Sequence, residues 1–118
     1  MEPRLTDDHL EIRFTPLERV LGLLRDARVP LSAVRSVEVV PDGMGAVRGL
    51  RAPGLAVPGL RRLGTWRARE GKTLVAVRRG QAAVRIGLEG ERWSELLLGT
   101  HDAVGLAATV RAAAPAPR

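Results

Sequence analysis

The chain of 118 residues contains no cysteine and no tyrosine, and aromatic residues make up only 3% of it. The absence of cysteine excludes disulfide bridges, thiolate nucleophiles and zinc sites built on thiolates. The core must therefore be packed mainly from aliphatic side chains around three rings, those of Phe14, Trp66 and Trp93. Because each ring can bury about 150 to 250 Å², we expect these three residues to anchor the interior.

Long apolar runs are also missing from the chain. No uninterrupted apolar stretch approaches the roughly 18 residues that a membrane-spanning helix needs. The first residues, among them Glu2, Asp7 and Asp8, are acidic and lack the basic and apolar segments of a signal peptide. These features predict a cytoplasmic protein, with a peripheral position at the inner face of the membrane as an alternative.

Lysine is nearly absent, because 18 of the 19 basic residues are arginine. A net charge of +6 invites an interpretation as a polyanion binder. The abundance of Ala, Gly, Pro, Val and Leu, however, is typical of GC-rich coding, which would also enrich arginine. The charge is uneven: residues 43–88 hold ten basic residues and one acidic residue (+9), and the remainder holds nine basic and 12 acidic residues (−3). The basic charge therefore belongs to the middle of the chain.

Four short β-strands are predicted in succession after residue 59. They cover residues 60–69, 72–79, 82–88 and 93–98. The strands are divided by Glu70-Gly71, Gly80-Gln81 and Glu89-Gly90-Glu91, where glycine accepts the positive φ of a tight turn. The pattern predicts an antiparallel meander.

The N-terminal half predicts two further strands and a helix. Residues 10–14 (LEIRF) alternate between apolar and polar types and indicate a half-buried strand. Residues 15–18 (TPLE) form a capping box with proline at the first helical position, which predicts a helix of two to three turns. Its apolar stripe consists of Leu17, Val20, Leu21 and Leu24. Residues 32–40 are rich in valine and predict the second strand.

The C-terminal segment predicts an amphipathic helix that begins near Asp102, whose side chain can cap the first turn. Its apolar stripe consists of Ala103, Leu106, Ala107, Val110 and Ala113. We expect Trp66 to be buried against Leu106 and Val110 of this stripe.

The domain organisation follows from these elements. Residues 1–9 are interpreted as a polar lead-in, residues 10–113 as one domain, and residues 114–118 as a disordered tail. Residues 44–59 lack periodicity and contain two Pro-Gly pairs, so we expect a long loop there, and loops of this length are usually functional or poorly ordered.

Four arginines in and after this loop are the candidate site, a surface for an anion or another partner: Arg48, Arg51, Arg61 and Arg62. No acidic residue lies between residues 43 and 69, and guanidinium groups bind phosphate and lipid head groups well. A solvated arginine-rich face that reflects coding bias is the alternative.

Four segments resemble the bacterial pleckstrin-homology-like (PH-like) domain proteins, an uncharacterised family from GC-rich bacteria. They are LEIRF (10–14), VPLSAVRSV (29–37), GLRAPG (49–54) with Pro58-Gly59, and GKTLVAV (71–77). The resemblance implies a mainly β (α+β) fold, a partly open antiparallel β-barrel of two orthogonal sheets. It also implies a short helix after the first strand, a C-terminal α-helix that caps the barrel, and a role as a binding platform for lipids, peptides or sister subunits.

Two departures limit what this resemblance implies. Phosphoinositide-binding PH domains carry several basic residues after the first strand, where this chain has only Arg19 beside Glu18. The final helix also lacks the tryptophan of classical PH domains. We therefore expect a non-enzymatic binding or assembly module that binds a protein partner or associates with itself, with an anionic lipid surface as an alternative.

Catalytic, metal and cofactor sites are not predicted. Ser32, Ser36 and Ser94 lack a G-x-S-x-G setting. His9 and His101 each neighbour an aspartate and could share a metal if the chain ends met, but we favour exposed positions for both.

Arginines also alternate with apolar residues along the predicted strands. This alternation predicts an exposed sheet face with Arg67, Arg69, Arg79 and Arg85. No aromatic residues alternate on that face, so nucleic-acid binding by stacking is not expected. An arginine-rich binder of nucleic acid or of an anionic surface is the alternative function, and steep salt dependence would reveal it.

Overall fold

The computed structural model describes residues 1–22, 25–47, 50–57, 61–69 and 71–114, with the backbone alone described for residues 21–22 and 50–57. Its strands are β1 (Glu2–Leu5), β2 (His9–Arg13), β3 (Ala27–Pro30), β4 (Val34–Val40), β5 (Leu50–Val57), β6 (Arg61–Ala68), β7 (Gly71–Arg78), β8 (Ala83–Leu88) and β9 (Glu95–Gly99). Its α-helices are α1 (Pro16–Gly22) and α2 (Ala103–Ala113), and two 3₁₀ turns are η1 (Leu31–Ala33) and η2 (Met44–Ala46).

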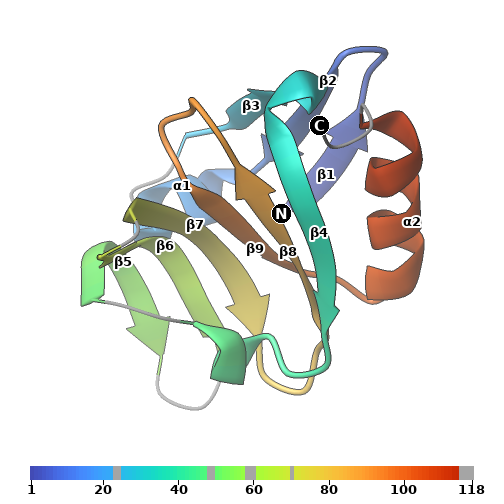
Figure 1. Cartoon of the computed structure of the whole chain (residues 1–118). Coiled ribbons are helices and arrows are strands. Elements are labelled where there is room, and N and C mark those ends of the chain that lie inside the picture. Colours follow the sequence, from blue (N-terminus) through green and yellow to red (C-terminus); the bar gives the residue numbers. More distant parts are fainter. Residues whose placement is uncertain (23–24, 48–49, 58–60, 70, 115–118) are drawn as a thin grey trace.

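The strands form two sheets, which Figure 1 shows with α2 beside β4. The first sheet is antiparallel in the order β1-β2-β3, and the second has the order β4-β8-β9-β7-β6-β5. The prediction of a mainly β fold with two sheets and a C-terminal helix is confirmed. Among the described residues, strand pairing does not close either sheet into a barrel.

The position of β9 differs from the predicted meander. β9 lies between β7 and β8, antiparallel to β8 and parallel to β7, although a short turn joins β7 to β8. The parallel pair departs from the all-antiparallel arrangement that the PH-like resemblance implies. Strands in a parallel pair are usually buried on both faces, and the apolar runs of β7 and β9 (Leu74 to Val77 and Leu96 to Leu98) are buried throughout.

The first core lies between the two sheets and is covered by α2. Residues of β2, β3, β4, β6, β7, β8 and β9 point into it, and the helix packs on β4 and β8. Its fully buried members include Leu10, Ile12, Leu74, Ile86, Leu98, Ala107 and Val110. The first sheet is thus apolar on its inner face, as the alternation in residues 10–14 predicted.

A second core lies on the opposite face of the six-stranded sheet. It consists of Val40, Trp66, Val75, Val77, Ala83 and Leu97, with Met44, Ala46 and Val47 packed against it. The predicted burial of Trp66 is confirmed, but its predicted contact with the stripe of α2 is wrong. Leu63 of β6 points into the first core, so Trp66, three residues further, points to the other face.

Helix α1 confirms the capping box and contradicts part of the stripe. Thr15 Oγ1 accepts a hydrogen bond from the amide of Glu18, and the carboxylate of Glu18 accepts one from the amide of Thr15. Leu17 and Val20, however, are 62% and 72% exposed, whereas Glu18 is buried. The helix is therefore rotated so that a charged residue faces the protein. Leu21 and Leu24 of the predicted stripe lie outside the described side chains.

Helix α2 begins as predicted, and its stripe packs as predicted except at Ala113, which was wrongly included. Asp102 Oδ1 accepts a hydrogen bond from the amide of Gly105, 2.9 Å away. Ala103, Ala107 and Val110 are buried, while Leu106 is partly buried and Ala113 is exposed. The turn glycines were also predicted correctly, since Gly80 and Gly90 have φ values of +74° and +77°.

Three strands lie where the sequence predicted none. Residues 2–5 form β1 against β2, residues 27–30 form β3, and the expected loop at 44–59 contains η2 and β5. Prediction of a long loop there was wrong. The register of β5 shifts between Arg51 and Gly54, and such an irregularity around a proline is typical of an edge strand.

Candidate functional site

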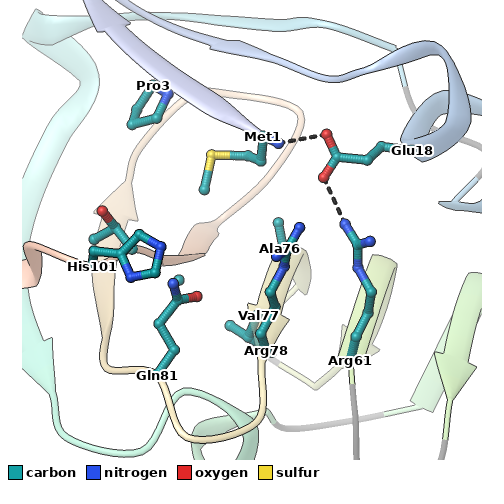
Figure 2. A pocket seen from close by; sticks show the side chains of 11 residues that line it. Met1, Pro3, Glu18, Arg61, Ala76, Val77, Arg78, Gln81 and His101 are labelled. Atoms are coloured by element: carbon teal, nitrogen blue, oxygen red, sulfur yellow. Dashed lines mark hydrogen bonds and ion pairs between the residues drawn. The ribbon is translucent and has the colours of Figure 1, made fainter.

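A pocket of about 190 Å³ opens where β1, β6 and the ends of β7 and β9 meet, beside α1 (Figure 2). Its polar lining comes from Glu18, Arg61, Arg78, Gln81 and His101. The groups come from four separate parts of the chain, so only the folded protein assembles them.

Strand register brings two arginines together at this pocket. Arg61 of β6 is directly opposite Arg78 of β7, and both side chains lie on the face that buries Leu63. Like charges directly opposite each other on antiparallel strands are destabilising. A negatively charged group close to the two arginines therefore stabilises the fold.

Glu18 of α1 supplies one negative charge close to the two arginines. Its Oε2 accepts a hydrogen bond from Nη2 of Arg61, 2.7 Å away, and its Oε1 accepts bonds from the amino nitrogen of Met1 and the amide of Thr15. Burial disfavours the charged carboxylate, but these hydrogen bonds and the positive charges outweigh burial and lower the pKa of Glu18 below its ordinary value. The carboxylate is thus held ionised beneath the protein surface.

Arg78 has a different environment from Arg61. Its side chain is exposed at the pocket, and no residue in the described ranges forms an ion pair or hydrogen bond with it. Two guanidinium groups and the amino group of Met1 therefore face one carboxylate, and Arg78 is the cation that does not pair with it. In Figure 2 the guanidinium of Arg78 lies beside that of Arg61 and points into the pocket.

A close backbone approach fixes the far side of the pocket. Gly99 ends β9, and a Cβ at that position would lie 2.7 Å from Oε1 of Gln81 and 3.2 Å from the carbonyl oxygen of Ala76. Only glycine permits this approach without displacement of Gln81. The turn that follows then carries His101 to the pocket next to Gln81.

The predicted arginine surface is divided by the structure. Arg61 and Arg62 are neighbours on β6 and point to opposite faces: Arg61 binds Glu18, and Nη1 of Arg62 donates to the carbonyl oxygen of Met44. Arg48 and the side chain of Arg51 lie outside the described residues. Whether the four arginines bind a common partner stays a prediction, but two of them have structural partners on different sides of the sheet.

Arg78, Gln81 and His101 were not predicted from the sequence as members of one site. A signal was present, because the predicted hairpin between residues 60 and 79 places Arg61 near Arg78. Glu18 was interpreted only as a helix cap, and no local pattern reports its contact with β6.

The four arginines of the predicted exposed sheet face do not share one face, because Arg69 and Arg79 lie in the turns after β6 and β7. Arg67, Arg69 and Arg79 are exposed as expected. The side chain of Arg85 is only 12% exposed, because its guanidinium lies under η2 and pairs with Glu95 at 3.0 Å. The prediction of an exposed Arg85 was wrong.

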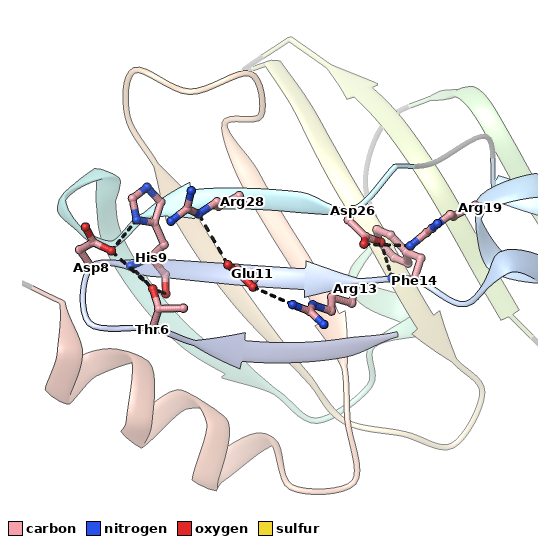
Figure 3. A network of polar contacts seen from close by, with 9 residues as sticks. All are labelled: Thr6, Asp8, His9, Glu11, Arg13, Phe14, Arg19, Asp26 and Arg28. Carbon is pink, nitrogen blue, oxygen red and sulfur yellow. Dashed lines mark hydrogen bonds and ion pairs between the residues drawn. The ribbon is translucent and has the colours of Figure 1, made fainter.

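The outer face of the first sheet carries a separate polar network (Figure 3). Nδ1 of His9 lies 2.7 Å from Oδ1 of Asp8, and Glu11 lies between Arg13 and Arg28. His9 thus has a carboxylate neighbour on the outer sheet, whereas His101 lines the pocket. Across the described ranges, no three His, Asp or Glu residues gather closely enough to hold a metal ion.

Comparison with known proteins gives no relative for this chain. No protein-family model matches it, and neither the curated proteins nor the solved structures contain a match. Within the part of the chain that the structure describes, no helix is long and apolar enough to cross a membrane.

Proposed function

We propose that this chain is a non-enzymatic binding module and that its pocket binds a small anion at Arg78. One observation carries the proposal: Arg61 and Arg78 are directly opposite on β6 and β7, and Glu18 pairs with Arg61. Because the second guanidinium is exposed at the pocket, an anion there would relieve the repulsion between the two arginines. Binding would thus be favoured by charge that the fold already positions.

The remaining polar groups support recognition of an anion. The amide nitrogen of Gln81 and a protonated ring nitrogen of His101 can donate hydrogen bonds on the side of the pocket opposite Glu18. Hydrogen bonds from charged donors to an anion are roughly twice as strong as those between neutral groups. The pocket therefore combines one strong donor, Arg78, with two weaker ones.

The scaffold of this proposal is the two-sheet β fold with its C-terminal helix. Assignment as a PH-like domain is a finer proposal, supported by the predominance of β structure and by the helices after the first predicted strand and at the C-terminal end. The parallel pair β7–β9 speaks against it. The function proposed for the pocket does not depend on that assignment.

Titration with acetate and inorganic phosphate tests the proposal. We expect saturable shifts of the Arg78 and His101 side-chain NMR signals, with a dissociation constant for acetate of about 1 to 10 mM. Arg78→Gln should weaken binding at least about tenfold, because a charge-assisted hydrogen bond is lost. Arg79→Gln is the matched control, since Arg79 is the next residue, is exposed and does not line the pocket.

Two outcomes would overturn the proposal. Equal binding by Arg78→Gln and Arg79→Gln would show that the anion is held by general positive charge. Absence of saturable shifts in the wild type would show that the pocket takes no small anion. Anionic vesicles of phosphatidylglycerol form a third arm, and binding lost equally in both variants would favour the alternative of a lipid surface.

A further inference from the structure

The two walls of the pocket differ in polarity, and this difference narrows the class of ligand. Figure 2 shows the side chains of Met1 and Pro3 on one side of the pocket, with Arg78, Gln81 and His101 facing them. A ligand that satisfied both walls would carry its charge at one end and an apolar body beside it.

The charges around the pocket favour a negative group on the ligand at one end only, next to Arg78. Glu18, which is buried, pairs with Arg61 at 2.7 Å and also with the amino group of Met1, whereas Arg78 has no ion pair among the described residues. A second negative charge on the ligand would face the carboxylate of Glu18, whose lowered pKa keeps it ionised at neutral pH. Like charges a few ångströms apart repel strongly in a partly buried site. Negative charge on a ligand is therefore favoured beside Arg78 and disfavoured beside Glu18.

The geometry of the donors also favours a carboxylate. A guanidinium group presents parallel N–H donors in a planar fork that matches the two oxygens of a carboxylate. The guanidinium of Arg78 is exposed, and no described residue pairs with it, so it can bind a carboxylate in this way. Gln81 and His101 can then donate to the remaining lone pairs or to a polar substituent.

The size of the pocket sets the length of the apolar body. About 190 Å³ corresponds to the volume of roughly six water molecules in the liquid, at about 30 Å³ for each. A ligand of about six to ten non-hydrogen atoms fills such a space, because bonded atoms pack more closely than separate waters. Longer chains would extend into solvent.

We infer that the pocket is a site for short monocarboxylates, in which Arg78 binds the carboxylate and the apolar body lies against Met1 and Pro3. This inference rests on the proposed function, since it names the ligand class of the same pocket. It predicts that affinity depends on both the charge and the chain length of the ligand.

A series of straight-chain acids with matched alcohols tests the inference. Acetate, butyrate, hexanoate and decanoate are titrated into the wild type, and affinity should rise about fourfold for each buried methylene group up to hexanoate. Decanoate should gain little over hexanoate. Hexanol should bind at least about tenfold more weakly than hexanoate to the wild type. The Arg78→Gln variant should bind the two equally, and Arg79→Gln should behave as the wild type.

The outcomes separate this inference from the proposed function. If acetate binds in an Arg78-dependent manner but hexanoate binds no more tightly, the pocket takes anions and the monocarboxylate inference is wrong. The same conclusion follows if phosphate binds more tightly than hexanoate, or if affinity continues to rise through decanoate. If no anion binds in an Arg78-dependent manner, the proposed function itself fails. Pro3→Ser should reduce the gain from acetate to hexanoate at least about twofold, and an unchanged gain would contradict the proposed position of the apolar body.

Discussion

The two faces of the six-stranded sheet bury their apolar side chains in different ways. The first face is covered by a second sheet and by α2, elements whose backbone hydrogen bonds are internal to them. The second face is covered by the short segment around η2, residues 43–47. This segment is held by Arg62 and Arg85, which donate to the carbonyl oxygens of Met44 and Ala46 at 3.2 and 2.7 Å.

This difference gives part of the arginine-rich character a structural explanation. A covering segment without sheet or helix partners exposes carbonyl groups that need donors from elsewhere. Arg62 on β6 and Arg85 on β8 supply those donors across the second core. Coding bias and a partner surface are therefore not the only explanations for the basic middle of the chain.

The largest expected difference between the faces concerns two neighbouring leucines of β9. Leu98 and Leu97 are both buried, the first in the core under α2 and the second under η2. We expect Leu98→Ala to lower the free energy of unfolding by about 4 kcal/mol and Leu97→Ala by about 2.5 kcal/mol. The reason is that the short segment around η2 can move to fill the cavity left by Leu97→Ala, whereas the sheets and α2 around Leu98 can move less.

Urea unfolding of both variants, followed by tryptophan fluorescence and circular dichroism, measures this difference. Leu→Ala removes the same atoms at both positions, so each variant is the control for the other. A larger loss for Leu97→Ala would show that the segment over the second face is as rigid as the sheet and helix over the first.

The second prediction tests the arginines that hold η2. Arg85→Met should cost about 3 kcal/mol, because it leaves Glu95 and the carbonyl of Ala46 without their partner. Arg62→Met should cost only about 1 kcal/mol, since one longer hydrogen bond is lost. Glu38→Gln is the control, with an expected change within about 0.5 kcal/mol, because its contact with Arg85 is 3.9 Å long and largely exposed. Equal costs for the two arginine variants would contradict a special role for Arg85.

The parts of the fold that the sequence predicted are those set by local signals. The strand limits from residue 61 to residue 99 follow from turns at Gly80 and Gly90, and both helix starts follow from caps at Thr15 and Asp102. These signals act within a few residues of the chain. They do not specify which strand pairs with which, so the position of β9 between β7 and β8 was not predicted.

The candidate site was predicted only in part for the same reason. Arg61 was identified, but its partner Glu18 is 43 residues away and belongs to a helix whose apolar pattern suggested a different buried face. Glu18 is buried in place of Leu17 and Val20, because its carboxylate both pairs with Arg61 and caps the helix. Periodicity alone carries no information on such an ion pair.

The third prediction concerns the ion pair between Glu18 and Arg61, on the first face of the sheet. We expect its loss to lower the free energy of unfolding less than the loss of Arg85 does. Glu18→Gln should cost about 1.5 kcal/mol at neutral pH, because the ionic part of its hydrogen bonds is lost. The folded-state pKa of Glu18 lies below its ordinary value of 4.5, so its contribution is complete above that value and is lost as pH falls through the folded-state pKa. The difference from the wild type should therefore shrink below about pH 4.5.

Unfolding free energies from pH 7 to pH 3 measure this dependence. Glu91→Gln is the control, since Glu91 is an exposed carboxyl away from the pocket. A difference between Glu18→Gln and the wild type that stayed constant down to pH 3 would contradict the ionic role of Glu18.

The smallest expected effects concern the caps of the two helices. Thr15 Oγ1 accepts the amide of Glu18 at 3.1 Å, and Asp102 Oδ1 accepts the amide of Gly105 at 2.9 Å. Removal of a cap costs about 1 kcal/mol, so Thr15→Ala and Asp102→Ala should lower stability by similar amounts.

The consequences of these two substitutions for the pocket should differ. Thr15→Ala loosens the residue that neutralises Arg61 and should alter acetate binding at Arg78, whereas Asp102→Ala frays a helix that covers the first core. Equal acetate affinity in the two variants, at matched stability, would show that Arg61 and the amino group of Met1 hold Glu18 in place and that the capping box contributes nothing to the site.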